Sequence, residues 1–204
     1  MKENYNKKLE QIIQKLDYTP NLLLHSCCAP CSSYVISYLT KYFNITIFYY
    51  NPNISPIEEY NKRKEEQIKL INSIKQENPI NIIDCDYDNN LYEEKIKGLE
   101  QEPEKGKRCT ICFNLRLEKT AVTAKNNNYD YFGTTLTVSP YKNCQLINEI
   151  GYNLENKYNI KWLPSDFKKN DGYKKSIELS KKYNLYRQNY CGCKYSQNKL
   201  PIVK

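Results

Sequence analysis

The sequence predicts an α/β fold with a doubly wound, mostly parallel sheet. Short apolar runs rich in β-branched residues alternate with segments of helical apolar spacing, and strands separated by helices imply right-handed parallel crossovers. The length of 204 residues suits one hydrophobic core better than two. Since no internal repeat or linker divides the chain, residues 1–204 are expected to form a single domain with a short polar C-terminal tail.

The first half of the chain predicts three helices and three strands. Residues 21–25 form a short apolar run that breaks into Ser26-Cys27-Cys28-Ala29-Pro30-Cys31, which indicates a buried strand followed by a loop. Pro56 suits the first turn of a charged helix. The expected helices span about 9–16, 34–42 and 56–75, and the other two strands span 45–50 and 82–86.

In the second half, residues 98–107 are polar and contain Gly and Pro, so they predict a loop that leads into a helix. The expected elements are a helix over 109–122, a strand over 131–136, a helix over 145–152, a short segment around Trp162 and a helix over 173–183. Ligands of doubly wound sheets bind at the carboxyl ends of the strands. The loops after His25 and Asp86 are therefore expected at the functional edge.

Composition favours a folded cytosolic protein. The mean hydropathy is −0.80, but aromatic residues make up 13% of the chain, which argues against disorder. The N-terminal residues lead into helical spacing rather than a signal sequence, and no stretch approaches membrane-spanning length, so we expect no membrane association. The net charge of +8 fits either a polyanionic partner or a Lys-rich solvated surface, and charge alone decides neither.

Cysteines are the strongest chemical signal. An odd number, nine, in a reducing compartment favours metal ligation or redox chemistry over structural disulfides. Seven of them fall into three clusters, which are Cys27-Cys28 with Cys31, Cys109 with Cys112, and Cys191 with Cys193. The remaining two, Cys85 and Cys144, are expected to be small buried or half-buried side chains.

A CxxC pair at a helix start, such as Cys109 and Cys112, directs two thiolates the same way. Together with Cys27 and Cys28 it supplies four thiolates, which can hold zinc or a 4Fe-4S cluster. A vicinal pair is unusual in structural zinc sites, so the pattern favours the cluster while zinc stays open. Cys31 is close enough to serve as a replacement or additional ligand.

The Cys191-Gly192-Cys193 motif predicts a redox pair. A disulfide across one residue is strained and easily reduced, which suits redox chemistry better than a structural role. Two alternatives stay open, that both cysteines remain thiols or that they bind the metal. His25 is the single histidine and is expected to be a satisfied core residue rather than a ligand or catalyst.

No nucleotide site is predicted. Enzymes that use ATP or NAD wrap phosphate with a glycine-rich loop, commonly after the first strand of such a sheet. Residues 25–31 contain no glycine, and no Walker or dinucleotide motif occurs elsewhere in the chain.

Six motifs, in order along nearly the whole chain, resemble the QueH-type epoxyqueuosine reductases. They are residues 25–30, 50–54, 108–117, 139–143, 166–173 and 186–193. The resemblance implies a fold like that of the adenine nucleotide α-hydrolases, the HUP fold. It also implies cobalamin-independent reduction of the epoxide of epoxyqueuosine in tRNA to queuosine, the last step of queuosine biosynthesis.

The resemblance further implies a set of site residues. It assigns a 4Fe-4S cluster to Cys27, Cys28, Cys109 and Cys112, and a redox-active disulfide to Cys191 and Cys193. Members of the family often carry, after the loop proline, an aspartate that helps to hold a second iron. Here that position is Cys31, so an additional iron near Cys31 stays open.

Two kinds of partner are expected, a tRNA that carries epoxyqueuosine and an electron donor that the sequence does not identify. Splayed anticodon bases are held by aromatic stacking and by basic contacts to phosphate. The candidate contacts are Tyr141, Lys142, Lys168, Lys169 and Arg187, and the candidate proton donors are Asp86, Tyr190 and His25.

Two other classes of function are weighed against this one. A thiol–disulfide oxidoreductase using Cys109 and Cys112 would lack the thioredoxin-like aromatic-Cys-Gly-Pro-Cys setting. A zinc-stabilised RNA-binding module would leave Cys191 and Cys193 without a role.

Overall fold

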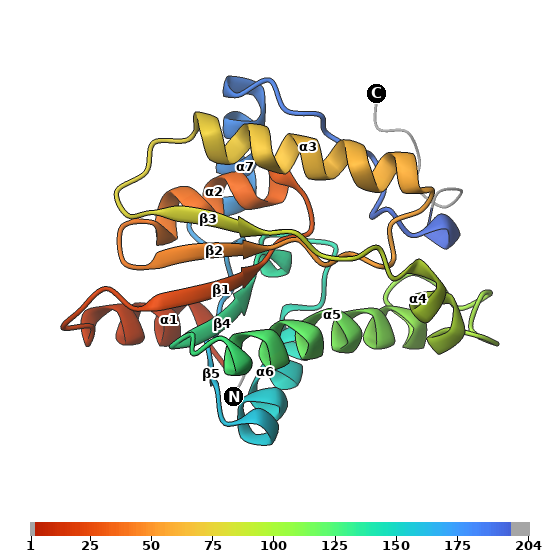
Figure 1. Ribbon diagram of the computed structural model, residues 1–204, viewed down its shortest axis with the longest axis horizontal. Helices are drawn as coiled ribbons and strands as arrows, with labels where there is room; N and C mark the ends of the chain where they lie inside the picture. Colours follow the sequence, from red (N-terminus) through yellow and green to blue (C-terminus); the bar gives the residue numbers. More distant parts are fainter. Residues whose placement is uncertain (1–2, 197–204) are drawn as a thin grey trace.

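A five-stranded, all-parallel sheet forms the centre of the computed structural model, which describes residues 3–196 (Figure 1). The strand order is β3-β2-β1-β4-β5, so the chain moves outward from β1 first in one direction and then in the other. The strands are β1 Asn21–His25, β2 Asn44–Phe48, β3 Ile80–Ile83, β4 Tyr131–Thr134 and β5 Lys161–Trp162. This confirms the predicted doubly wound α/β class, and the arrangement is consistent with a HUP-like fold.

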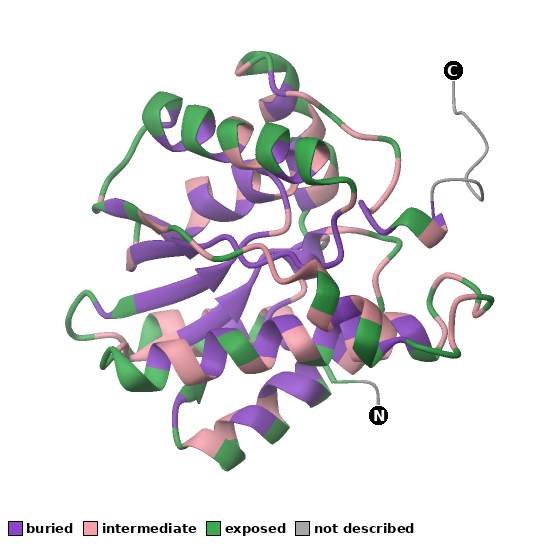
Figure 2. Cartoon of the chain, turned by 45° about the vertical axis from the view of Figure 1, so that its right-hand side comes forward, coloured by how far each residue is buried: buried purple, intermediate pink, exposed green. Residues whose placement is uncertain are grey.

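Helices cover both faces of the sheet. They are α1 Tyr5–Gln14, α2 Ala29–Leu39, α3 Ile57–Ser73, α4 Asn89–Lys95, α5 Lys107–Asn126, α6 Cys144–Tyr158 and α7 Gly172–Lys182, with short 3₁₀ turns η1 Leu136–Val138 and η2 Lys194–Ser196. Leu22 and Leu24 of β1 pack with α2 and α3, whereas Leu23 packs with α5 and α6. Successive strand residues point to opposite faces, so both faces of β1 are apolar and buried (Figure 2).

The register of the strands brings their carboxyl ends together. His25 at the end of β1 pairs with Phe48 of β2 on one side and with Thr134 of β4 on the other. The segments that follow these three strands therefore leave the sheet at the same edge. Among the described residues, no helix is both long and apolar enough to cross a membrane.

Three helices or strands differ from the sequence-based prediction in their bounds or in their presence. Helix α2 begins at Ala29 inside the predicted loop, because Pro30 suits a first helical turn although the surrounding residues show no apolar period. Helix α4, only seven residues long, was not predicted, since it is too short to show a helical repeat. Strand β3 spans Ile80–Ile83 rather than 82–86, which leaves Asp86 beyond its end. Most of the predicted polar tail, residues 197–204, lies outside the described residues.

Candidate active site

A cavity of about 160 Å³ lies at the carboxyl edge of the sheet. Cys27 and Cys28 reach it from the end of β1, Asn53 from the segment after β2, and Leu136 from the segment after β4. Its lining includes all seven clustered cysteines, which are Cys27, Cys28, Cys31, Cys109, Cys112, Cys191 and Cys193. Cys85 and Cys144 do not line it.

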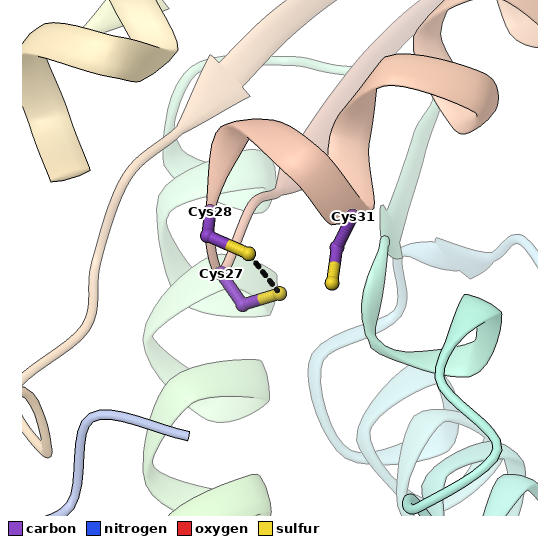
Figure 3. Close-up of side chains that lie close together, drawn as sticks. All are labelled: Cys27, Cys28 and Cys31. Atoms are coloured by element: carbon purple, nitrogen blue, oxygen red, sulfur yellow. Dashed lines mark hydrogen bonds between the residues drawn. The ribbon is translucent and has the colours of Figure 1, made fainter. Parts of the chain in front are cut away.

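The first cysteine group surrounds the N-terminus of α2 (Figure 3). The sulfur atoms of Cys27, Cys28 and Cys31 lie within 4.8 Å of one another, and those of Cys27 and Cys28 are 3.8 Å apart. Cys28 occupies the N-cap position in an extended conformation. The first turn of a helix leaves backbone N–H groups free, and its partial positive charge favours thiolates.

The thiols of this group differ in their pKa. Hydrogen bonds from the thiols of Cys27 and Cys31 hold the pKa of the Cys28 thiol well below its ordinary value. The pKa of the Cys31 thiol is correspondingly raised, first by its hydrogen bond to Cys27. The arrangement thus favours the thiolate form of Cys28, and a bound metal ion would take the place of the thiol protons of the loop.

The second group is at the start of α5. Cys109 and Cys112 are one helical turn apart, and the backbone N–H of Lys105 donates a hydrogen bond to Cys109 Sγ at 3.3 Å. Cys112 is buried, and burial raises the pKa of its thiol. One turn further along the helix, Arg116 is 4% exposed and donates from Nε to the Cys112 carbonyl at 3.1 Å.

Arg116 shows that the cavity fits an anionic group. Burial disfavours its cation, but the nearby sulfurs of Cys112, Cys27 and Cys191 raise its pKa above the ordinary value. None of the ion pairs within residues 3–196 involves Arg116. A buried cation requires compensating negative charge, and a cluster ligated by four thiolates carries it.

The third group is on the C-terminal segment. Cys191 Sγ lies 3.2 Å from Ser196 Oγ, and Cys193 Sγ lies 3.2 Å from the Tyr92 hydroxyl. Both cysteines are free thiols in the structure, which therefore leaves the predicted redox disulfide as a prediction. Cys193 and Tyr92 pack in one apolar cluster with Cys112, so this pair adjoins the helix α5 group.

Comparison with known proteins matches the sequence of this chain to one family. A family model described as "Epoxyqueuosine reductase QueH" matches residues 22–199. The chain belongs to the QueH family. Relatives of that name include one from Staphylococcus epidermidis, 47% identical over 98% of this chain and 87% of its own length. Others come from Streptococcus pyogenes, 43% identical over 96% and 78%, and Thermotoga maritima, 36% identical over 86% and 89%.

In this QueH chain, some predicted site residues lie outside the cavity. His25 is fully buried, its Nδ1 is 2.9 Å from Thr134 Oγ1, and its Nε2 is 3.1 Å from the Tyr50 carbonyl. Burial lowers the pKa of His25 to about 3, so it is a neutral core residue, as expected. Asp86 is exposed and does not line the cavity.

The predicted tRNA contacts divide into two groups. Tyr141, Lys142 and Arg187 line the cavity, as does the candidate proton donor Tyr190. Tyr141 is 54% exposed, so an aromatic ring is available for stacking at the mouth. Lys168 and Lys169 do not line the cavity, and Lys168 Nζ is 3.1 Å from Asp166 Oδ1.

Sequence reasoning missed several cavity residues. They are Asn53, Arg63, Tyr92, Arg108, Arg116 and Gln188, none of which was assigned a role. The four-residue spacing from Cys112 to Arg116 could have placed Arg116 on the cysteine face of α5. Arg63 gave no such signal, because it stands among many charged residues of α3. Tyr92 lies on the helix α4 that was not predicted.

Proposed function

We propose that the protein reduces the epoxide of epoxyqueuosine in tRNA, which yields queuosine and water. The observation that carries this proposal is the meeting of seven cysteines from three segments at one cavity, in a chain of the QueH family. The curated relatives are named epoxyqueuosine reductases. Because tRNA is the substrate, we infer that the protein acts in the cytosol.

The proposed cofactor is a 4Fe-4S cluster held by Cys27, Cys28, Cys109 and Cys112. The support is the donor set, since two sulfurs come from the helix α2 loop, two from the start of α5, and the Arg116 cation lies beside them. When bound, such a cluster supplies electrons one at a time. Cys31 is the remaining thiol of the loop and is the proposed ligand for an additional iron, if one binds.

Cys191 and Cys193 are proposed as the chain's own two-electron store. Oxidation of the dithiol to a disulfide releases two electrons and two protons. Conversion of the epoxide to an alkene consumes two electrons and two protons and releases the oxygen as water, so the two half-reactions balance. An external electron donor then reduces the disulfide to restore the dithiol. Tyr92 donates to or accepts from Cys193 and holds that sulfur in the cavity.

Basic and aromatic residues at the cavity mouth are proposed to hold the anticodon loop. Arg187 is exposed, and its guanidinium donates to two neutral groups, the Tyr173 hydroxyl at 3.3 Å and Ser180 Oγ at 3.5 Å. Its positive charge is therefore available to a phosphate. Tyr141 presents its ring for base stacking. With the net charge of +8, such contacts would draw the polyanion towards the site.

The test is conversion of a defined substrate. Anaerobically reconstituted protein is mixed with dithionite and tRNA that carries epoxyqueuosine, and the digested nucleosides are analysed by mass spectrometry. The proposal predicts loss of one oxygen from the modified nucleoside. Protein that contains only zinc and leaves the epoxide intact would instead support the zinc-stabilised RNA-binding alternative, which the family membership does not favour.

A further inference from the structure

Three polar side chains of the cavity have a buried atom without a hydrogen-bond partner in the described part of the chain. These atoms are Asn53 Oδ1, Arg63 Nη2 and Gln188 Oε1. Asn53 is 3% exposed and Arg63 is 2% exposed. Leaving such groups unpaired is costly, so they point to a polar ligand. Arg108 Nε is a fourth such atom, but three backbone carbonyls already anchor that guanidinium.

The three side chains surround one corner of the cavity. An atom at the Cβ position of Gly192 would lie 2.8 Å from Arg63 Nη1 and 2.8 Å from Cγ1 of Ile54, the neighbour of Asn53. Arg63 Cζ lies 5.0 Å from the ring centroid of Tyr190, two residues after Gln188, and Arg63, Gln188 and Cys28 all line the same cavity. A ligand held in this corner therefore shares the cavity with Cys28.

The corner suits a neutral ligand better than an anion. Arg63 Nε is 2.7 Å from Glu59 Oε1, so the guanidinium charge is already compensated. The free groups are then one N–H donor and two amide oxygens, and the oxygens would repel a phosphate. Hydroxyl groups both donate and accept hydrogen bonds, and they match this set.

We propose that Asn53 and Arg63, with Gln188, bind the hydroxyl groups of the substrate's cyclopentane ring and so select the modified base. This inference rests on the proposed function and extends it. The ring of epoxyqueuosine carries two hydroxyl groups beside its epoxide, whereas unmodified guanosine has no such ring. Asn53 and Arg63 are therefore specificity residues that hold the epoxide next to the cavity sulfurs.

The test compares two tRNAs of identical sequence, one with epoxyqueuosine and one with unmodified guanosine in the anticodon. The dissociation constants of both are measured with anaerobically purified full-length protein, and their ratio gives the selectivity. Wild-type protein should prefer the modified tRNA. Asn53→Leu should reduce the ratio of the two dissociation constants about fivefold, as expected for the loss of one neutral hydrogen bond. Arg63→Gln should reduce it about tenfold, because the hydrogen bond that it removes comes from a charged group.

The melting temperature of the Asn53→Leu variant shows whether Asn53 serves substrate recognition or the stability of the fold. Asn53→Leu removes an oxygen that has no partner among residues 3–196, so the melting temperature should stay the same or rise. The control Arg187→Gln, at the exposed mouth, should weaken both tRNAs equally and leave the ratio unchanged. If Arg63→Gln does not fold, Asn53→Leu alone decides.

One outcome would contradict the inference alone, and another would contradict the proposed function as well. If wild-type protein converts epoxyqueuosine but the folded Asn53→Leu variant keeps the wild-type ratio, the inference is wrong and the proposed function stands. If wild-type protein shows no conversion at all, the proposed function fails, and the inference fails with it.

Discussion

Replacing Gly192 with alanine is expected to release the Cys191–Cys193 segment from the cavity. Gly192 has a φ of +100°, and an added Cβ would lie 2.8 Å from both Arg63 Nη1 and Ile54 Cγ1. The backbone conformation costs an L-residue about 1–2 kcal/mol, and the crowding costs about 1–3 kcal/mol. The sum is about 2–5 kcal/mol.

A small number of contacts hold this segment, so its local stability is of the same size as that cost. The Tyr92 hydroxyl is 3.2 Å from Cys193 Sγ, and Lys194 Nζ is 3.0 Å from Glu93 Oε2. The Ser55 N–H donates to the Gly192 carbonyl at 3.0 Å, and the Tyr195 hydroxyl donates to Glu93 at 2.7 Å. Each hydrogen bond contributes about 1 kcal/mol. The segment should therefore detach locally, with little change in the urea midpoint of the whole protein.

Anaerobic thiol labelling and turnover measure this effect. In Gly192→Ala, Cys191 and Cys193 should react with a thiol reagent at least about tenfold faster, as expected for detachment by more than 1.4 kcal/mol, and conversion of epoxyqueuosine should fall. Gly98→Ala is the matched control, because Gly98 has a φ of +82° but nothing within 4 Å of an added Cβ. Equal labelling and equal turnover in the two variants would refute the reasoning.

The remaining predictions concern charge and redox chemistry. Arg116→Met removes the buried cation beside Cys112 and should lower the free energy of unfolding of the cluster-loaded protein by about 3–5 kcal/mol, measured by anaerobic urea unfolding. Arg116→Lys should restore part of that loss. Unchanged stability and iron content in Arg116→Met would contradict this prediction. Binding of tRNA should weaken linearly on a log–log plot against salt, and Arg187→Gln should reduce the slope by about 1; a salt-independent affinity would exclude phosphate contacts. The double variant Cys191→Ser/Cys193→Ser should keep the cluster absorption spectrum and lose turnover, whereas loss of iron would assign the pair to the metal site.

The alternation of strands and helices was enough to predict a doubly wound, mostly parallel sheet, and strand β1 was predicted at its observed bounds. Because the ends of parallel strands share one edge, the sequence also indicated where Cys27 and Cys28 would lie. The other side of the site could not be predicted in this way. Tyr92 reaches the cavity from a seven-residue helix with no detectable repeat, and Arg63 is buried although its neighbours in α3 are charged.

The sequence also contained no indication of residues that reach the cavity through packing between segments far apart in the chain. Gln188 reaches the cavity only because the C-terminal segment packs against α3, where Arg63 Cζ lies 5.0 Å from the ring of Tyr190, two residues further along. Local spacing carries no information about such distant packing. Conversely, Lys168 resembled a phosphate contact in sequence, but the fold pairs it with Asp166 outside the cavity.

Iron and acid-labile sulfide per chain test the central claim most directly, namely that four cysteines hold one 4Fe-4S cluster. Both are measured after anaerobic reconstitution of single Ala variants of Cys27, Cys28, Cys109 and Cys112, with Cys85→Ala and Cys144→Ala as controls outside the cavity. Wild-type protein and both controls should contain about four sulfide and at least about four iron, and each of the four variants should contain much less of both. Full iron and sulfide in all four variants would contradict the ligand assignment.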